Sequence, residues 1–271
     1  MLWEKRVNRP IGVFDSGVGG LSIVSALAQA LPAEDFVYVA ANKYMPFGQK
    51  TAEEIQAISE KIVHFLIKQH NVKLVVIACN TATVTSIDYL RKRFSMPFVG
   101  VVPVVKPACA LTKSRCVAIL STPLTSSGEY IKSLIATFGK DINVLNIACP
   151  GLADLVEMGK GDSLEVETLL QELVLPAQEQ GADVYGLCST HYSFVREPLQ
   201  KITGSGVCIL DAIIPVTHRV MRVLSDSQEV STSDKKVATC TFYATTQSAT
   251  FQAVGQELIG PMMRSVQLIE L

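Results

Sequence analysis

The sequence predicts an α/β protein with two similar lobes, each built on a largely parallel sheet flanked by helices. Apolar runs alternate with amphipathic stretches along 271 residues, 48% of which are hydrophobic, so the chain can bury a substantial core. Two of these runs, Val75–Ala78 and Val184–Leu187, are each followed by a cysteine and by small hydroxyl or amide residues. This duplication favours two related lobes.

Eight apolar runs predict buried strands, because a strand inside a parallel sheet is covered on both faces. They are Ile11–Phe14, Phe36–Val39, Leu74–Ala78, Phe98–Val101, Val117–Leu120, Val144–Ile147, Val184–Leu187 and Val207–Leu210. Apolar residues recur at helical spacing over Thr51–Gln69 and Ser163–Gln180, which predicts two helices that cover the sheets. The polar, Ser-rich segment Ser225–Lys236 is expected to be a loose loop.

Prolines at 103, 107 and 215 interrupt this pattern and mark expected crossings between the lobes. We therefore place the first lobe at residues 1–102 plus 214–271 and the second lobe at residues 103–213. The second lobe is expected to be inserted into the first.

The charge balance points to a small-molecule partner. The 24 basic and 25 acidic residues nearly cancel, so no charge excess favours nucleic acid or an anionic membrane. The seven cysteines are odd in number and lack CxxC spacing, which is typical of reduced thiols in the cytoplasm. Met1–Arg6 carries charges where a signal peptide needs its apolar region. We expect a cytoplasmic protein that needs no metal and no cofactor.

The segment Asp15–Gly20 follows the first predicted strand and precedes a helical pattern. Its glycines allow close approach of a ligand, and free amides at the start of a helix favour a carboxylate or phosphate. The spacing matches neither GxGxxG nor the P-loop, so a nucleotide site is not indicated. The alternative is that Asp15 only caps the helix.

Two cysteines follow predicted strands, Cys79 and Cys188. Because ligands collect beyond the carboxyl ends of parallel strands, both thiols are expected to face one cleft. Asn80 and Thr81 place polar groups beside Cys79 at the start of a helix, where the helix dipole lowers a thiol pKa. The alternative is a small buried hydrophobe, which is the common fate of a free cysteine. Two weak acids on opposite sides of a carbon can remove a proton from one face and return one to the other.

His191 follows Thr190 in the turn after the second of these strands. A histidine there can carry a proton near neutral pH or bind a carboxylate. Glu157 is a candidate to orient His191. The alternative is a solvated carboxylate on a helix surface.

Together these segments resemble the glutamate racemases, a family of cofactor-independent enzymes in the aspartate/glutamate racemase superfamily. The likeness runs in order from about residue 11 to residue 211. The matching segments are Ile11–Leu21, Pro46–Gly48, Ala78–Ala82, Cys149–Pro150, Leu155–Gly159 and Thr190–Tyr192.

The resemblance implies two lobes that face each other across a cleft holding the active site, with Cys79 as the cysteine that removes the α-proton. It implies no cofactor, the supply of D-glutamate for peptidoglycan, and a homodimer as the default assembly. The substrate-binding residues that it implies are Asp15, Ser16, Pro46, Phe47, Gly48, Asn80, Thr81 and Thr190.

This chain departs from the family pattern at four places, one of which is the cluster of Thr122, Thr125, Ser127 and Tyr130, which fits a family element only with one residue missing. Ala41 stands where the family has an aspartate that assists the first cysteine, and Thr245–Gln247 stands where the family has an acidic element. At the second site the family reads Gly-Cys-Thr-His, whereas this chain reads Cys188-Ser189-Thr190-His191.

Two alignments of the second site compete. Matching the two strands by their thiols assigns Cys188 to the second base, whereas counting from Asp183 and His191 assigns Ser189. We favour Ser189, because successive strand residues point to opposite faces and Cys188 needs a bulge to take its place. A serine hydroxyl is a far weaker acid than a thiol and needs a partner such as His191 to act as a base.

Three functions remain open at this point. The leading hypothesis is a racemase that interconverts L- and D-glutamate by thiol-based proton transfer. The second is a diverged relative that uses Cys79 alone, as an isomerase or decarboxylase or for one-sided proton transfer. The third is a non-catalytic protein that binds a dicarboxylate. Fold similarity alone cannot separate them, because function lies in the site.

Overall fold

The fold is that of a computed structural model, which describes residues 8–234 and 237–271. The chain divides into two compact units: unit 1 contains the described residues up to Val101 together with Ile213–Leu271, and unit 2 is Val102–Ala212. The segment Met1–Arg6 and residues 235 and 236 of the expected loop lie outside the described residues. Within the described ranges, no helix has both the length and the apolar character needed to cross a membrane.

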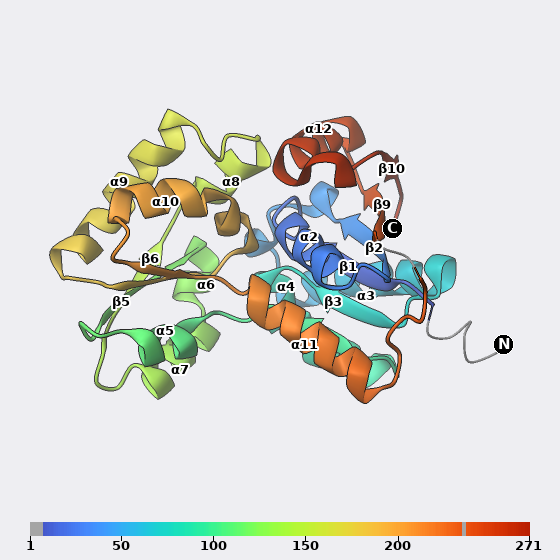
Figure 1. The fold of residues 1–271 in the computed structure, drawn as a ribbon, viewed down its shortest axis with the longest axis horizontal. Coiled ribbons are helices and arrows are strands. Elements are labelled where there is room, and N and C mark those ends of the chain that lie inside the picture. The colour runs from blue at the N-terminus through green and yellow to red at the C-terminus, as the bar shows by residue number, and fades with distance from the viewer. Residues whose placement is uncertain (1–7, 235–236) are drawn as a thin grey trace. The chain divides into compact units, whose positions relative to one another are not determined.

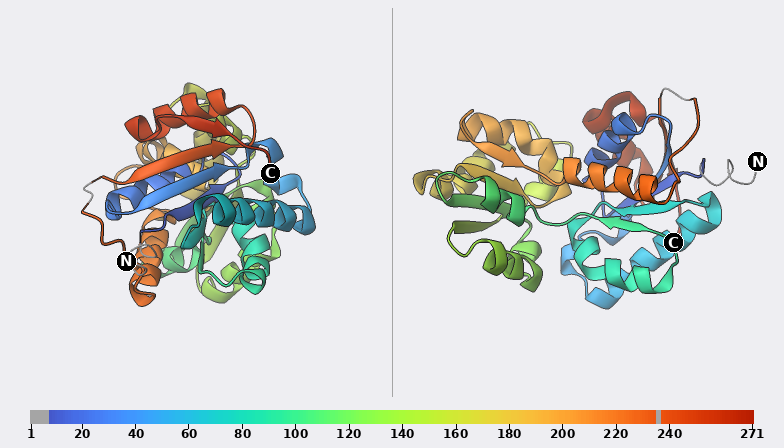
Figure 2. Two further views of the ribbon diagram at one scale, coloured as in Figure 1. Left: turned by 90° about the vertical axis from the view of Figure 1, so that its right-hand side faces the viewer. Right: turned by 60° about the horizontal axis from the view of Figure 1, so that its bottom comes forward.

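Unit 1 is built on a six-stranded parallel sheet in the order β10-β9-β2-β1-β3-β4. Its strands are β1 (Ile11–Asp15), β2 (Asp35–Ala40), β3 (Leu74–Ile77), β4 (Phe98–Gly100), β9 (Thr239–Ala244) and β10 (Val266–Leu268). The red strand β9 lies beside the blue strand β2 (Figures 1 and 2), although they come from opposite ends of the chain. Because every pair is parallel, the carboxyl ends of all six strands lie at one edge of this sheet.

Helices cover the sheet of unit 1 in two groups, since α3 packs on α4 while α2 packs on α11 and α12. They are α2 (Leu21–Ala30), α3 (Ala52–His70), α4 (Asn80–Arg93), α11 (Ile213–Asp226) and α12 (Ser248–Ile259), with the 3₁₀ helices η1 (Asn42–Tyr44), η2 (Phe47–Gln49) and η4 (Gly260–Met262). Helix α3 confirms the predicted helix. It begins at a capping box in which Thr51 and Glu54 each accept a hydrogen bond from the other's backbone amide, and it buries Ile55 and Ile62.

Unit 2 is built on a four-stranded parallel sheet in the order β6-β5-β7-β8. Its strands are β5 (Cys116–Ser121), β6 (Asn143–Ala148), β7 (Val184–Leu187) and β8 (Cys208–Leu210). Its helices are α5 (Val105–Leu111), α6 (Pro123–Ser127), α7 (Glu129–Phe138), α8 (Leu152–Glu157), α9 (Leu164–Glu179), α10 (Arg196–Thr203) and the 3₁₀ helix η3 (Thr190–Val195). Helix α9 confirms the second predicted helix, and the two flanked parallel sheets confirm the predicted fold class.

The sequence analysis missed the last two strands of unit 1, β9 and β10. The first half of β9, Thr239–Thr241, alternates exposed and half-buried residues, and only Phe242–Ala244 is fully buried. A strand of this kind lacks the continuous apolar run by which the other strands were recognised.

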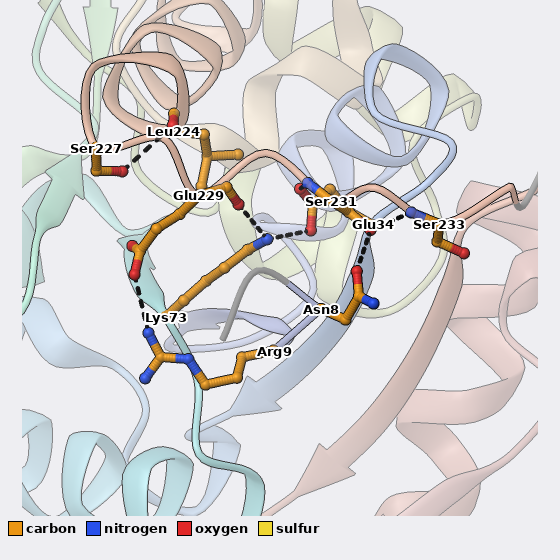
Figure 3. Close-up of polar contacts among 9 residues, drawn as sticks. All are labelled: Asn8, Arg9, Glu34, Lys73, Leu224, Ser227, Glu229, Ser231 and Ser233. Atoms are coloured by element: carbon orange, nitrogen blue, oxygen red, sulfur yellow. Dashed lines mark hydrogen bonds and ion pairs between the residues drawn. The ribbon is translucent and has the colours of Figure 1, made fainter. Parts of the chain in front are cut away.

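The expected loop at Ser225–Lys236 is confirmed in part, because residues 229–234 have no regular secondary structure, but this segment is not loose. Ser225 belongs to α11, and the following residues are fastened to buried charges at the start of β3 (Figure 3). Lys73 is 1% exposed, and its Nζ lies 2.7 Å from Glu34 Oε2 and donates to the Glu229 carbonyl at 2.6 Å. Glu34 Oε1 also accepts from the Ser231 amide at 2.8 Å. A buried charge needs such partners, which a polar segment can supply.

Candidate active site

The Asp15 carboxylate lies fully buried at the carboxyl end of β1. Its Oδ1 accepts hydrogen bonds from the backbone amide of Ser16 at 2.5 Å and from the Ser16 hydroxyl at 3.1 Å. The N-cap residue of helix α2 is Gly20, five residues after Asp15, so Asp15 is not the N-cap of that helix. A Cβ on Gly20 would come within 2.8 Å of both the Asp15 and the Ala78 Cβ atoms, so this loop needs glycine to approach the sheet edge.

Cys79 lies at the end of β3 and is the residue before α4, as predicted. Its Sγ accepts a hydrogen bond from the Ala82 amide at 3.5 Å and lies 3.8 Å from the Ser16 hydroxyl. β1 and β3 are neighbours in the sheet, which is why Ser16 and Cys79 meet.

The predicted lowering of the Cys79 pKa is wrong. Burial and, to a smaller extent, the nearby charge of Asp15 raise the pKa of the Cys79 thiol to about 12. The hydrogen bond from the start of α4 acts in the opposite direction but is outweighed. Cys79 can therefore serve as a thiolate near neutral pH only if the charge of Asp15 is offset or the thiol becomes better solvated.

Asn80 is the first residue of α4 and is 7% exposed. Among the residues that the structure describes, neither its amide nitrogen nor its amide oxygen has a hydrogen-bond partner. A buried amide without partners is costly and calls for a polar ligand or a bound water. Thr81 is half-buried beside it, whereas the Thr83 hydroxyl is used structurally, since it bonds the Ile77 carbonyl and the Val101 amide.

The Pro46–Gly48 element lies in the same unit, but its central side chain faces the core. Phe47 is 3% exposed and belongs to one apolar cluster with Ala41 and Cys79, while Pro46 is exposed and Gly48 is half-buried. Ala41 is fully buried, and its amide donates to the Asp15 carbonyl at 2.8 Å. A methyl group therefore occupies the place beside Asp15 where the resemblance led us to look for an acid.

In unit 2, Cys188 and Ser189 differ in their surroundings. Cys188 is 1% exposed, its Sγ accepts from the Val104 amide at 3.3 Å, and burial raises the pKa of its thiol to about 12. A Cβ on Gly186, two residues earlier, would also approach Val104, to 3.0 Å, so Cys188 lies on that same face. Ser189 is 8% exposed, and within the described part of the chain its hydroxyl makes no hydrogen bond.

His191 and Glu157 form a close pair in unit 2, with 2.5 Å between His191 Nε2 and Glu157 Oε1. Glu157 ends α8, and His191 lies in η3 directly after Thr190. The side chain of His191 is 8% exposed and that of Glu157 is 18% exposed, so this is not a solvated carboxylate. The pair holds the imidazole in one orientation, two residues after Ser189.

The sequence analysis missed Asn42, whose side chain joins the turn after β2 to the end of β9. No residue pattern marks it, because its partners are about two hundred residues away in the sequence. Over the described residues, no three or more His, Cys, Asp or Glu side chains are grouped so that they could hold a metal ion.

The chain is thus an α/β protein with two parallel sheets, and it carries a buried Asp-Ser-Cys-Asn cluster at the end of one sheet and a His–Glu pair beyond the other. The chain belongs to the Asp/Glu/hydantoin racemase family, whose model matches residues 11–216. It is 42% identical over 218 residues to a glutamate racemase of Herpetosiphon aurantiacus, which covers 80% of this chain and 85% of that protein.

Solved structures agree with this assignment. A glutamate racemase isoform from Bacillus anthracis superposes with a TM-score of 0.82 at 29% identity, covering 97% of this chain and 98% of that one. A glutamate racemase from Francisella tularensis, solved in complex with D-glutamate, gives a TM-score of 0.81 at 27% identity, with coverage of 97% and 98%.

Proposed function

We propose that this protein exchanges the α-proton of glutamate and interconverts its L and D forms slowly, with Cys79 as the principal base. Such an activity would supply D-glutamate for peptidoglycan precursors. The observation that carries the proposal is the unpartnered, buried amide of Asn80 beside the Cys79 thiol. An amide that can both donate and accept, next to a thiol, suits an amino acid bound by its polar end.

The substrate carboxylate is assigned to the Asn80 amide, with Ser16 as a further donor, and the substrate ammonium is assigned to Asp15. An ammonium group beside Asp15 offsets the negative charge that raises the Cys79 pKa. Substrate binding therefore favours the thiolate. The thiolate takes the α-proton: the Cα–H bond breaks, an S–H bond forms, and the electron pair is left on the α-carbon and delocalised into the carboxylate.

The proton returns by one of two routes. Return from Cys79 to the same face exchanges hydrogen with solvent but restores the starting enantiomer. Return to the opposite face inverts the carbon and needs a second acid, the role that the resemblance to the racemases implies for the position of Ser189. Because a serine hydroxyl is a much weaker acid than a thiol, inversion is expected to be slower than exchange.

A second candidate function is a dicarboxylate-binding protein without turnover. It is favoured by Ala41, which leaves no acid beside Asp15 at that position, and by Ser189, which carries no thiol. The binder keeps the Asn80 and Ser16 donors and therefore predicts affinity without exchange.

The test follows each enantiomer of glutamate separately in D₂O by proton NMR, with polarimetry for inversion. The unmodified chain should lose the α-proton signal faster than it inverts the carbon. Cys79→Ala should abolish both, while Cys109→Ala, which removes another buried thiol, should leave both unchanged. Retention of most activity in Cys79→Ala contradicts the assignment. No exchange, together with a rise in melting temperature at millimolar glutamate, would support the binder.

A further inference from the structure

One amide side chain ties the turn that leaves β2 to the end of β9. Asn42 Oδ1 accepts hydrogen bonds from the Thr245 amide at 3.0 Å and the Thr246 amide at 3.1 Å. Asn42 Nδ2 donates to the Thr246 carbonyl at 2.6 Å. The Thr245 hydroxyl, 3.1 Å from Asn42 Oδ1, also accepts from the Lys43 amide at 2.9 Å. We call these contacts the Asn42 bridge.

The Asn42 bridge lies at the edge of the sheet that carries the candidate site. β9, β2, β1 and β3 are consecutive in the sheet. β9 and β2 end directly before Thr245 and Ala41, β1 ends at Asp15, and β3 ends two residues before Cys79. The Ala41 amide bonds the Asp15 carbonyl, and the Thr245 amide bonds the Ala40 carbonyl at 3.1 Å. Asn42 therefore sets the path of the chain directly after the residue that touches the Asp15 backbone.

After Asn42 the chain continues into the Pro46–Gly48 element. Phe47 packs into the apolar cluster that contains Ala41 and Cys79. The turn is thus held at two points: by the polar contacts of Asn42 at its start and by the burial of Phe47 further on. Loss of the Asn42 side chain would leave residues 41–46 held by the hydrogen bonds from the Ala41 amide to Asp15 and from the Lys43 amide to Thr245.

The bridge also joins two segments that depart from the family pattern. Ala41 and Thr245–Gln247 stand where the resemblance placed acidic residues, and here these two segments meet through the uncharged Asn42 and Thr245 side chains.

We propose that Asn42 is a positioning residue, which fixes the β2 turn so that Asp15 and the Pro46–Gly48 element are held in place for the substrate. This inference rests on the function proposed above. Asn42 does not touch the reacting atoms. It acts through the backbone of Ala41 and through the placement of Phe47, so its loss should weaken substrate binding more than it slows proton transfer.

The experiment compares Asn42→Ala, Asn42→Asp and the control Asn146→Ala, in which an amide that donates to the Ser126 carbonyl in unit 2 is removed. Amide hydrogen exchange of residues 41–50 and 245–247 is measured by mass spectrometry, and KM and kcat are measured for α-proton exchange. Asn42→Ala should speed amide exchange in both segments about tenfold and raise KM several-fold with a smaller change in kcat. Asn42→Asp keeps an acceptor for the Thr245 and Thr246 amides but loses the donor to the Thr246 carbonyl, so it should recover only part of both effects.

Unchanged amide exchange in Asn42→Ala overturns the bridge, and faster amide exchange with an unchanged KM overturns the positioning role. The control should change neither quantity. If the unmodified chain exchanges no α-proton, the calorimetric Kd for glutamate replaces KM. A chain that neither exchanges nor binds glutamate overturns the proposed function and the positioning role together, while the amide-exchange result still decides whether the bridge exists.

Discussion

At the scale of single residues, the chemistry of Cys79 depends on its distance from water and from Asp15. Both factors raise the pKa of the thiol, to about 12 in total. A thiolate is the reactive form, and below the pKa its fraction grows about tenfold with each pH unit. The structure therefore describes a base that is held neutral until a ligand changes its surroundings.

We expect Asp15→Asn to make Cys79 more reactive toward iodoacetamide at pH 8. The variant removes the charge that raises the Cys79 pKa but keeps an oxygen that can accept from the Ser16 amide. Alkylation followed by peptide mass spectrometry should show a several-fold faster reaction at Cys79. Cys208, which is exposed, is the internal control and should react equally fast in both proteins. An equal or slower rate at Cys79 in the variant would contradict this electrostatic explanation.

The second residue-scale prediction concerns the Cys188-Ser189 pair. Cys188 is directed to the Val104 amide and buried, whereas the Ser189 hydroxyl is unbonded within the described residues. We expect Cys188→Gly combined with Ser189→Cys to raise the rate of racemisation by about a hundredfold, because a placed acid–base group contributes at least that much. Adding Ala41→Asp should raise the rate further. Polarimetry with each glutamate enantiomer is the measurement.

Two single variants decide between the alignments. If Ser189 occupies the second position, Ser189→Ala should slow inversion and Cys188→Ala should not. Fast turnover of both enantiomers by the unmodified chain, lost in Cys188→Ala and kept in Ser189→Ala, would show that Cys188 holds that position instead.

At the scale of secondary-structure elements, the Lys73 contacts fasten the connection between α11 and β9 to the sheet of unit 1. They lie at the start of β3, away from the strand ends that carry Asp15 and Cys79. Figure 3 shows Lys73 reaching from the start of β3 to Glu34 and Glu229, while Arg9 pairs with the Glu229 carboxylate at 3.0 Å. Burial lowers the pKa of Lys73, and its contacts with Glu34 act against that shift. The buried Lys73–Glu34 pair therefore stabilises the fold only while both charges are present. Loss of either partner leaves an unpaired buried charge, which lowers the free energy of unfolding.

We expect Lys73→Met to lower the free energy of unfolding by about 3–5 kcal/mol, because it leaves the buried Glu34 carboxylate without its cation. The double variant Lys73→Met with Glu34→Gln should recover part of that loss, since the uncharged glutamine side chain can still accept from the Ser231 amide. Urea unfolding at pH 7 measures both. Lys132→Met, which removes a cation from an exposed pair with Glu129, is the control and should cost less than about 1 kcal/mol. Equal losses in the two single variants would show that burial does not matter here.

At the scale of the whole molecule, buried thiols in both units make stability depend on alkaline pH. Burial raises the pKa of Cys79, Cys149 and Cys188 to about 12, from an ordinary value of 9.0. Between these values the unfolded chain releases protons that the folded chain retains. Folding is therefore favoured fully below about pH 9, and the contribution is lost as the pH rises toward 12.

We expect the melting temperature to fall steadily between pH 9 and pH 11, and the fall to be shallower in Cys149→Ala than in the unmodified chain. Cys149 is 1% exposed, so its thiol should make a full contribution. Cys208→Ala is the matched control, because that thiol is exposed and should not alter the slope. Differential scanning fluorimetry in buffers of equal ionic strength measures the slopes. Parallel slopes in all three proteins would exclude thiol ionisation as the cause.

Local pattern was enough to predict most of the fold, because strands that are covered on both faces must be apolar throughout. Ile11–Phe14, Leu74–Ala78 and Val184–Leu187 were predicted on that ground, and all are strands within a residue or so. The positions of Asp15 and Cys79 at strand ends followed from the same pattern. These features depend on neighbours in the chain, so the sequence by itself determined them.

Other features depend on residues that are distant in the sequence, and only the tertiary structure decided them. β9 becomes a strand because β2 and β10 lie on either side of it. The segment after α11 is fastened by Lys73 and Glu34, and the β2 turn is fastened by Thr245 and Thr246. The Cys79 pKa is raised because folding buries the thiol beside the charge of Asp15. Periodicity reports which face of an element is buried, but charge, solvation and partners depend on what the fold places against that face.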